Sequence, residues 1–420
     1  MRKALHLSFL FLFTVSVSFA QYNRLTKKAD SLYKAKSYKE AAAAYLLAAD
    51  STPAFLNTKD HYYNAACCFA LVNDWRAAMK YLKIAVYDKG YKSYDHLLSD
   101  SDLNILHKEK EWDEIVNKLK SGKEKLSDPH HAKLVTTDIH NFWNAFDKVQ
   151  KDTARREQIF IEDYFNKSSP GLKDYFSSKI GTTASFAKNQ AGKPEFYKAI
   201  RKNTLSIDTM KGTIYKYFEK LKSIYDEASF PDIYFLMGRW NSAGTVSDNG
   251  LLLGVDQISK TPDIPQHELN LWEKNNFNNP QNIPVIVMHE LIHFQQDKIK
   301  EDTTLLFYAL VEGMADFICE LVTGKNPSQR QQDYAQTRRK EIWEDFKKEM
   351  FLDRAYNWIA NGDKETKDKP ADLGYYIGYE ICKSYYEQAA DKKEAIKEIL
   401  SIQDHKAFLE KSKYEEKVSR

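Results

Sequence analysis

Residues 284–294 read PVIVMHELIHF, an apolar run that carries two histidines four positions apart. Pro284 suits the first turn of a helix, and positions i and i+4 lie on one face of that helix. We therefore expect a buried helix that holds His289 and His293 close enough together to bind one tetrahedral Zn²⁺ ion. Glu290, one position along, is placed to act as the base for a metal-bound water. The alternative is a helix with two half-buried histidines and a capping glutamate, an arrangement that is unfavourable without a metal or partners.

The third metal ligand must come from another segment. The extended motif HExxHxxGxxH is absent, because Gln296 replaces its glycine. Glu312 lies nineteen residues after His293, and the polar run at 301–304 offers a helix break and an N-cap. A second helix returning antiparallel would bring Glu312 opposite the histidines as a ligand. Asp316, one turn further on, would then accept a hydrogen bond from a ligand histidine. The alternative for Glu312 is an ordinary solvated carboxylate.

These motifs resemble those of the gluzincin group of zinc metallopeptidases. More narrowly, residues 130–420 resemble a bacterial family of predicted zinc-dependent proteases. The resemblance implies a hydrolase that cleaves peptide bonds in a peptide or protein substrate, with zinc as cofactor and Glu290 as general base. Further similarities lie at 142–143, 169–172, 238–245 and 374–379.

The resemblance also implies a substrate-binding strand. In gluzincins, an edge strand over the active-site helix binds the substrate backbone as an added strand. The stretch 240–246 is the candidate, with Asn241, Gly244 and Thr245 as substrate-binding residues. A plain hairpin loop is an equally good interpretation of this stretch.

A tyrosine is the candidate for a further catalytic role. Gluzincins commonly stabilise the oxyanion with a Tyr or His from a helix that follows the ligands. No histidine lies between His293 and His405, which leaves the tyrosines at 375, 376 and 379. Tyr375 matches the family's glycine-tyrosine position best, with Tyr379 second. Packing aromatics are the alternative for all three.

The N-terminal part of the chain contains an internal repeat. Small and aromatic residues of 29–49 recur in 65–85 at an offset of 36. This pattern predicts paired antiparallel helices and resembles the tetratricopeptide repeat, whose usual period is 34. We expect a repeat module over residues 21–120, a linker at 118–129, and a metallopeptidase-like domain over 130–420. Such repeats are docking surfaces, so a protein partner is expected to bind there.

Strand signals are few and helical patterns dominate. Ile233–Met237 and Leu251–Val255 are apolar runs, and a turn signal at Asn249-Gly250 precedes the second. They predict a hairpin or two adjacent strands. From residue 284 onward the pattern is helical almost throughout. The predicted fold class is therefore mainly α (α+β), with a helical-repeat module before a domain that contains a small sheet.

The first twenty residues and the composition indicate an exported, folded protein. Residues 1–20 have a basic start, a short apolar core and a small-x-small end, which predicts a signal peptide and a periplasmic or secreted protein. No cysteine follows the apolar core, so we expect no lipid or other membrane anchor. Removal of Arg2 and Lys3 with the signal peptide lowers the net charge from +3 to +1, so nucleic acid is not an expected partner.

A second function remains open at this point. The chain could be a periplasmic repeat-containing scaffold or binding protein whose peptidase-like domain is structural or inactive. The repeat module supports this alternative, whereas the intact HExxH with Glu290 favours the enzyme.

Overall fold

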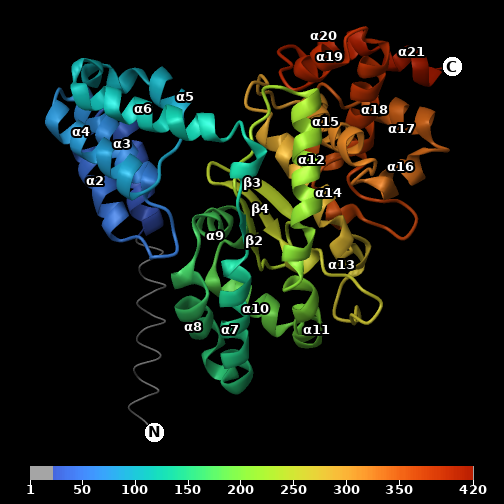
Figure 1. Ribbon diagram of the computed structural model, residues 1–420, viewed down its shortest axis with the longest axis horizontal. Helices are drawn as coiled ribbons and strands as arrows, with labels where there is room; N and C mark the ends of the chain where they lie inside the picture. Colours follow the sequence, from blue (N-terminus) through green and yellow to red (C-terminus); the bar gives the residue numbers. More distant parts are fainter. Residues whose placement is uncertain (1–21, 420) are drawn as a thin grey trace. The chain divides into compact units, whose positions relative to one another are not determined.

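The structure is a computed structural model that describes residues 22–419 (Figure 1). The predicted signal peptide, residues 1–20, lies outside the described residues. The chain divides into two compact units. The first comprises the described part of Met1–Leu126 together with Thr137–Ala187, and the second comprises Ser127–Thr136 and Lys188–Arg420. Residues 137–187, which the sequence analysis placed after the linker, therefore group with the repeat module.

Antiparallel helix pairs form the start of the first unit. After a helix at 22–34 come α2 (Tyr38–Asp50), α3 (Lys59–Leu71), α4 (Trp75–Lys83), α5 (Tyr94–Ser99) and α6 (Lys110–Lys125). Ala29, Ala41, Ala42, Ala65 and Cys68 are fully buried in one cluster between these helices. Their small side chains allow the helix backbones to approach closely, which explains why alanine recurs in the repeat.

Aromatic side chains join the rest of the first unit to the repeats. This part contains α7 (Thr137–Lys151), α8 (Arg156–Asp163), α9 (Pro170–Tyr175) and the start of α10 (Thr183–Ala191). Phe55, in the loop after α2, lies 4.8 Å from Phe176 and 5.8 Å from Phe165, measured between ring centroids. Aromatic contacts of this kind stabilise beyond the area they bury. They account for the grouping of 137–187 with the N-terminal helices.

The second unit is built on a four-stranded sheet. Its strands are β1 (Leu134–Val135), β2 (Ile233–Leu236), β3 (Gly244–Ser247) and β4 (Gly250–Gly254), in the order β1-β2-β4-β3. β2 pairs in parallel with β1 and β4, and β3 pairs antiparallel with β4. The two predicted apolar strands are thus adjacent and parallel, and the hairpin is β3–β4. β3 lies at an edge of the sheet.

Helices form most of the second unit (Figure 1). α14 (Ile283–Phe294) packs against β3 and β4 and also against α15 (Leu305–Thr323), which in turn packs along α18 (Leu373–Gln388). The other helices are α11 (Pro194–Thr204), α12 (Lys211–Ile224), α13 (Leu271–Asn275), α16 (Gln329–Ala335), α17 (Arg339–Lys347), α19 (Lys392–Ile399), α20 (His405–Ser412) and α21 (Tyr414–Ser419). The predicted fold class, mainly helical with a small sheet, is confirmed.

Candidate metal centre

α14 carries the two histidines on the side that faces α15. Apart from Glu290, its other side chains are apolar, and Val287, Leu291 and Ile292 are fully buried. The Nε2 atoms of His289 and His293 lie 3.0 Å apart, and their side chains are 11% and 14% exposed. The helical spacing of i and i+4 therefore brings two imidazole nitrogens to one point in a nearly enclosed site.

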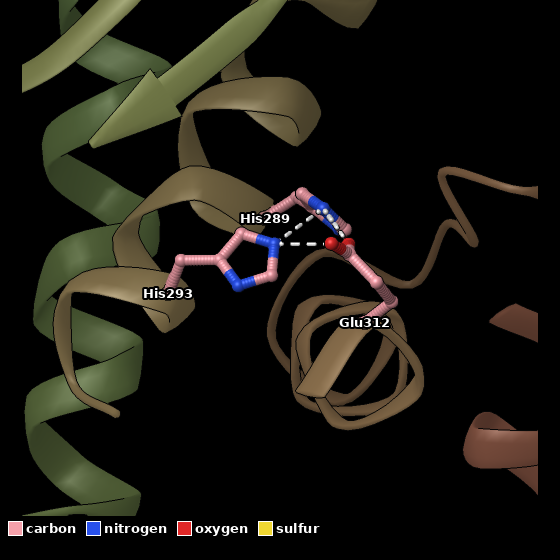
Figure 2. A group of neighbouring side chains, drawn as sticks. All are labelled: His289, His293 and Glu312. Carbon is pink, nitrogen blue, oxygen red and sulfur yellow. Dashed lines mark hydrogen bonds and ion pairs between the residues drawn. The ribbon is translucent and has the colours of Figure 1, made fainter. Parts of the chain in front are cut away.

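α15 supplies the carboxylate at the same point. The helix starts where the sequence predicts, because the Thr304 hydroxyl accepts a hydrogen bond from the Phe307 N–H at 3.3 Å. Glu312 Oε2 lies 3.2 Å from His293 Nε2 and 3.6 Å from His289 Nε2 (Figure 2). One ligand atom from each of these three residues lies within 4.8 Å of the others. The structure thus brings together all three predicted metal ligands.

The other ring nitrogen of each histidine also has a partner. His289 Nδ1 lies 2.9 Å from Asp316 Oδ1, an ion-pair contact with the predicted partner. His293 Nδ1 lies 2.9 Å from Gln296 Oε1, and the Gln296 amide donates to the Val311 carbonyl at 2.8 Å. Such partners orient a ligand histidine and select the tautomer that leaves Nε2 available. This role of Gln296 was not predicted from the sequence, although its position three residues after His293, just past the end of α14, was a usable signal.

The charged groups of the cluster shift one another's pKa values. Burial disfavours the charged imidazole, yet Asp316 and Glu312 raise the pKa of His289 well above its ordinary value. Glu312 likewise raises the pKa of His293 against the effect of burial. Burial opposes ionisation of Glu312, but His293 and His289 hold the pKa of that carboxyl far below its usual range. A metal ion would replace the protons that otherwise balance these charges.

Glu290 lies against the edge strand β3, near enough to the cluster for its charge to raise the pKa values of His289 and His293. Its side chain is buried, and a Cβ at Gly244 would lie 2.2 Å from Glu290 Oε1. Only glycine fits at that position without a shift. Of the other predicted substrate-binding residues, Thr245 pairs with Leu252 in the sheet, and Asn241 lies in the loop between β2 and β3.

Among the three candidate tyrosines, Tyr375 lies beside the metal cluster. Its ring is nearly parallel to that of His289, with centroids 6.3 Å apart. Burial and the nearby Glu312 carboxylate raise the pKa of Tyr375 well above its ordinary value. Tyr379 packs against Phe317, and Tyr376 is buried beside Tyr414.

The donor set fits zinc. Two imidazole nitrogens and one carboxylate oxygen are ligands that Zn²⁺ commonly takes, and oriented histidines favour its binding. The sequence prediction of Zn²⁺ is consistent with this chemistry and stays a prediction.

Among residues 22–419, no helix combines the length and apolar character needed to cross a bilayer.

Comparison with known proteins assigns the chain to a family. The family model described as gliding motility protein GldB matches residues 123–416. No curated protein and no solved structure matches the chain. The matched residues include the whole metal cluster. The predicted membership of a gluzincin protease family is therefore wrong, since the family that matches is a lipoprotein family of gliding motility and no protease family matches.

The predictions that followed from that resemblance change with it. A zinc metallopeptidase, the hydrolase class and a peptide substrate are not supported, and the alternative of a scaffold or binding protein agrees better with the match. The catalytic roles of Glu290 and Tyr375, and the substrate-binding roles of Asn241, Gly244 and Thr245, lose the resemblance that suggested them. A lipoprotein family implies export. The chain belongs to the family of gliding motility protein GldB.

Proposed function

We propose that the chain is a non-catalytic binding or scaffold protein of the gliding machinery. The family match over residues 123–416 carries the proposal. A component of a motility machinery works through contacts with other proteins, and the helix pairs of the first unit offer a surface for them. The chain acts outside the cytoplasm, in the periplasm or beyond it.

In this proposal, the metal centre stabilises the second unit. His289 and His293 hold Zn²⁺ from α14 and Glu312 holds it from α15, so one ion links two helices. Asp316 and Gln296 keep the two rings in the orientation that binding needs. The ion supplies positive charge in a site where an ionised Glu312 is only 22% exposed. Structural zinc contributes directly to the free energy of folding.

The test separates a scaffold from an enzyme through two kinds of variant. Glu290→Gln keeps the shape of the side chain and removes the base, whereas His293→Ala removes a metal ligand. Each variant replaces the wild-type gene in gliding cells, and gliding speed, zinc per chain and melting temperature are measured. We expect Glu290→Gln cells to glide like the wild type, and His293→Ala to lose zinc, stability and gliding.

A matched control tests whether loss of a surface histidine, away from the metal centre, affects zinc content or gliding. His267 is 64% exposed and lies beside Glu195 at the surface of the same unit, so His267→Ala should keep zinc and gliding. If Glu290→Gln abolished gliding while zinc content and melting temperature stayed normal, the non-catalytic function would be refuted. If His293→Ala kept its full zinc content, the proposed ligand set would be refuted.

A further inference from the structure

A groove of about 570 Å³ lies on the repeat module, well away in sequence from the metal centre. We call it the repeat groove. It is formed where α2, the end of α3 and the start of α4 meet. The side chains that line it include Lys39, Leu46, Phe69, Val72, Trp75 and Arg76. Its volume falls in the usual range of about 300–1,000 Å³ for binding pockets.

The apolar floor of the repeat groove is held in place by packing beneath it. The Phe69 ring stacks on Tyr81, with centroids 5.3 Å apart and planes 13° apart. Asn73 adopts a positive φ of 61° in the turn between α3 and α4, which brings Val72 and Trp75 to the same surface. Trp75 is half-buried against the core of the module. A ligand would therefore meet a preformed apolar surface.

The rim of the groove is positively charged. Lys39 and Arg76 are exposed, and neither forms an ion pair with a carboxylate among the described residues. The Arg76 guanidinium lies 4.7 Å from the Trp75 ring centroid, a cation–π contact that holds it at the edge of the floor. Asp74 also lines the groove and caps α4 by accepting a hydrogen bond from the Ala77 N–H, so the lining carries two positive charges and one negative charge.

From this combination we propose that the repeat groove binds a short segment of a partner protein in which carboxylates alternate with apolar side chains. Apolar side chains would cover Leu46, Phe69 and Val72, and carboxylates would pair with Lys39 and Arg76. Charge complementarity of this kind selects a partner and orients it. The inference rests on the proposed binding function and names the chemistry of one partner.

Fluorescence anisotropy with the full chain tests the proposal. The probe is a labelled pool of ten-residue peptides with Asp or Glu at alternate positions and Leu, Ile, Val or Phe between them. A second pool carries Lys at the acidic positions. We expect the acidic pool to bind, more weakly as salt increases, and the basic pool not to bind. Lys39→Glu with Arg76→Glu should weaken binding about 100-fold, at roughly tenfold for each charge pair.

The matched control reverses two charges elsewhere on the same module. Arg24 and Lys28 are exposed on the helix at 22–34 and do not line the groove, so Arg24→Glu with Lys28→Glu should bind within about twofold of the wild type. The single variants Lys39→Ala and Arg76→Ala, each expected to weaken binding about tenfold, replace the double reversal if that variant fails to fold.

Several results would overturn the inference. These are no binding of the acidic pool at millimolar concentration, equal binding of both pools, or equal loss in the control variant. A dimer in sedimentation that the Lys39/Arg76 variant loses would show that a second copy occupies the groove instead. Binding of a single-stranded oligonucleotide in place of the acidic pool would show a nucleic-acid site. If the peptide test failed while Glu290→Gln and His293→Ala behaved as the proposed function expects, the groove alone would be refuted and the proposed function would stand.

Discussion

The contact between α15 and α18 should not tolerate a single methyl group. A Cβ on Gly378 would lie 1.7 Å from the Ala309 carbonyl oxygen, and a Cβ on Gly313 would lie 2.1 Å from the Gly378 carbonyl carbon. Non-bonded heavy atoms normally stay about 3.5 Å apart, so Gly378→Ala must push the backbones of α15 and α18 apart by more than ~1 Å. Backbone atoms cannot rotate away as a side chain can. The whole interface must therefore loosen.

The expected loss is large enough to measure. Overpacking typically destabilises by about 1–3 kcal/mol, and a backbone clash belongs at the upper end, whereas alanine in a helix returns about 1 kcal/mol. A net loss of about 2 kcal/mol would lower the melting temperature by roughly 4–8 °C for a unit of this size. Glu312 directly precedes Gly313, so zinc affinity should also fall. Thermal unfolding by circular dichroism and competition with a zinc chelator measure the two effects.

A control variant makes the same change where space is free. Gly212 lies exposed in α12 of the same unit, and a Cβ there would meet nothing within 4 Å. Gly212→Ala should leave the melting temperature unchanged or raise it slightly, because alanine favours the helix. The reasoning would be refuted if Gly378→Ala melted within about 1 °C of the wild type with full zinc affinity, against the 2–4 °C expected for each kcal/mol.

Three further predictions concern the residues beside the ligand histidines, the buried Asp256 carboxylate near the sheet, and the histidines themselves. Asp316→Asn and Gln296→Leu should each weaken zinc binding about 10–100-fold in a chelator competition, because the native Asp316 and Gln296 side chains orient the ligand histidines. Unchanged zinc affinity would exclude that role. Asp256→Asn should lower the free energy of unfolding in urea by about 1–3 kcal/mol, since its carboxylate accepts two backbone N–H groups at 3.1 Å and an amide NH₂ would face one of them; a neutral effect would contradict this. The metal-free chain should lose stability as the pH rises above about 6.5, the ordinary pKa of histidine in the unfolded chain. The fold raises the pKa values of His289 and His293, so protonation of these histidines stabilises the folded state. This stabilisation is complete below the unfolded pKa and is lost as the pH rises through the folded pKa. The zinc-loaded chain should instead resist a chelator better as the pH rises, because zinc binds deprotonated histidines. If metal-free stability and chelator resistance changed with pH in the same direction, the coupling between histidine protonation and zinc binding would be disproved.

Local features of the metal centre could be predicted from the sequence. The spacing of His289 and His293 places both side chains on one face of a helix, whatever the rest of the chain does. The polar break at 301–304 and the apolar flanks of Glu312 predict a returning helix, and the structure brings that carboxylate to the histidines. The mainly helical class and the two central strands follow from periodicity in the same way. Each depends on contacts within one element or between neighbouring elements.

The chemistry of the site did not follow from the same pattern. A histidine pair with a nearby glutamate describes a place for a metal, and many kinds of protein hold a metal in that way. The protease interpretation came from a resemblance of short motifs. The match to the GldB family extends over residues 123–416 and outweighs it.

The sequence by itself thus determined the helices, the cluster of two histidines and a glutamate proposed to bind metal, and the repeat, because each is set by side chains at fixed local spacing. Only the tertiary structure decided that β2 pairs in parallel with β4, that residues 137–187 pack with the repeats, and that Tyr375 lies beside His289. It also decided that Gln296 orients His293. These outcomes depend on which segments, distant in the sequence, bury their apolar faces against each other. Local periodicity shows which face of a helix or strand is apolar, but not which other segment packs on that face.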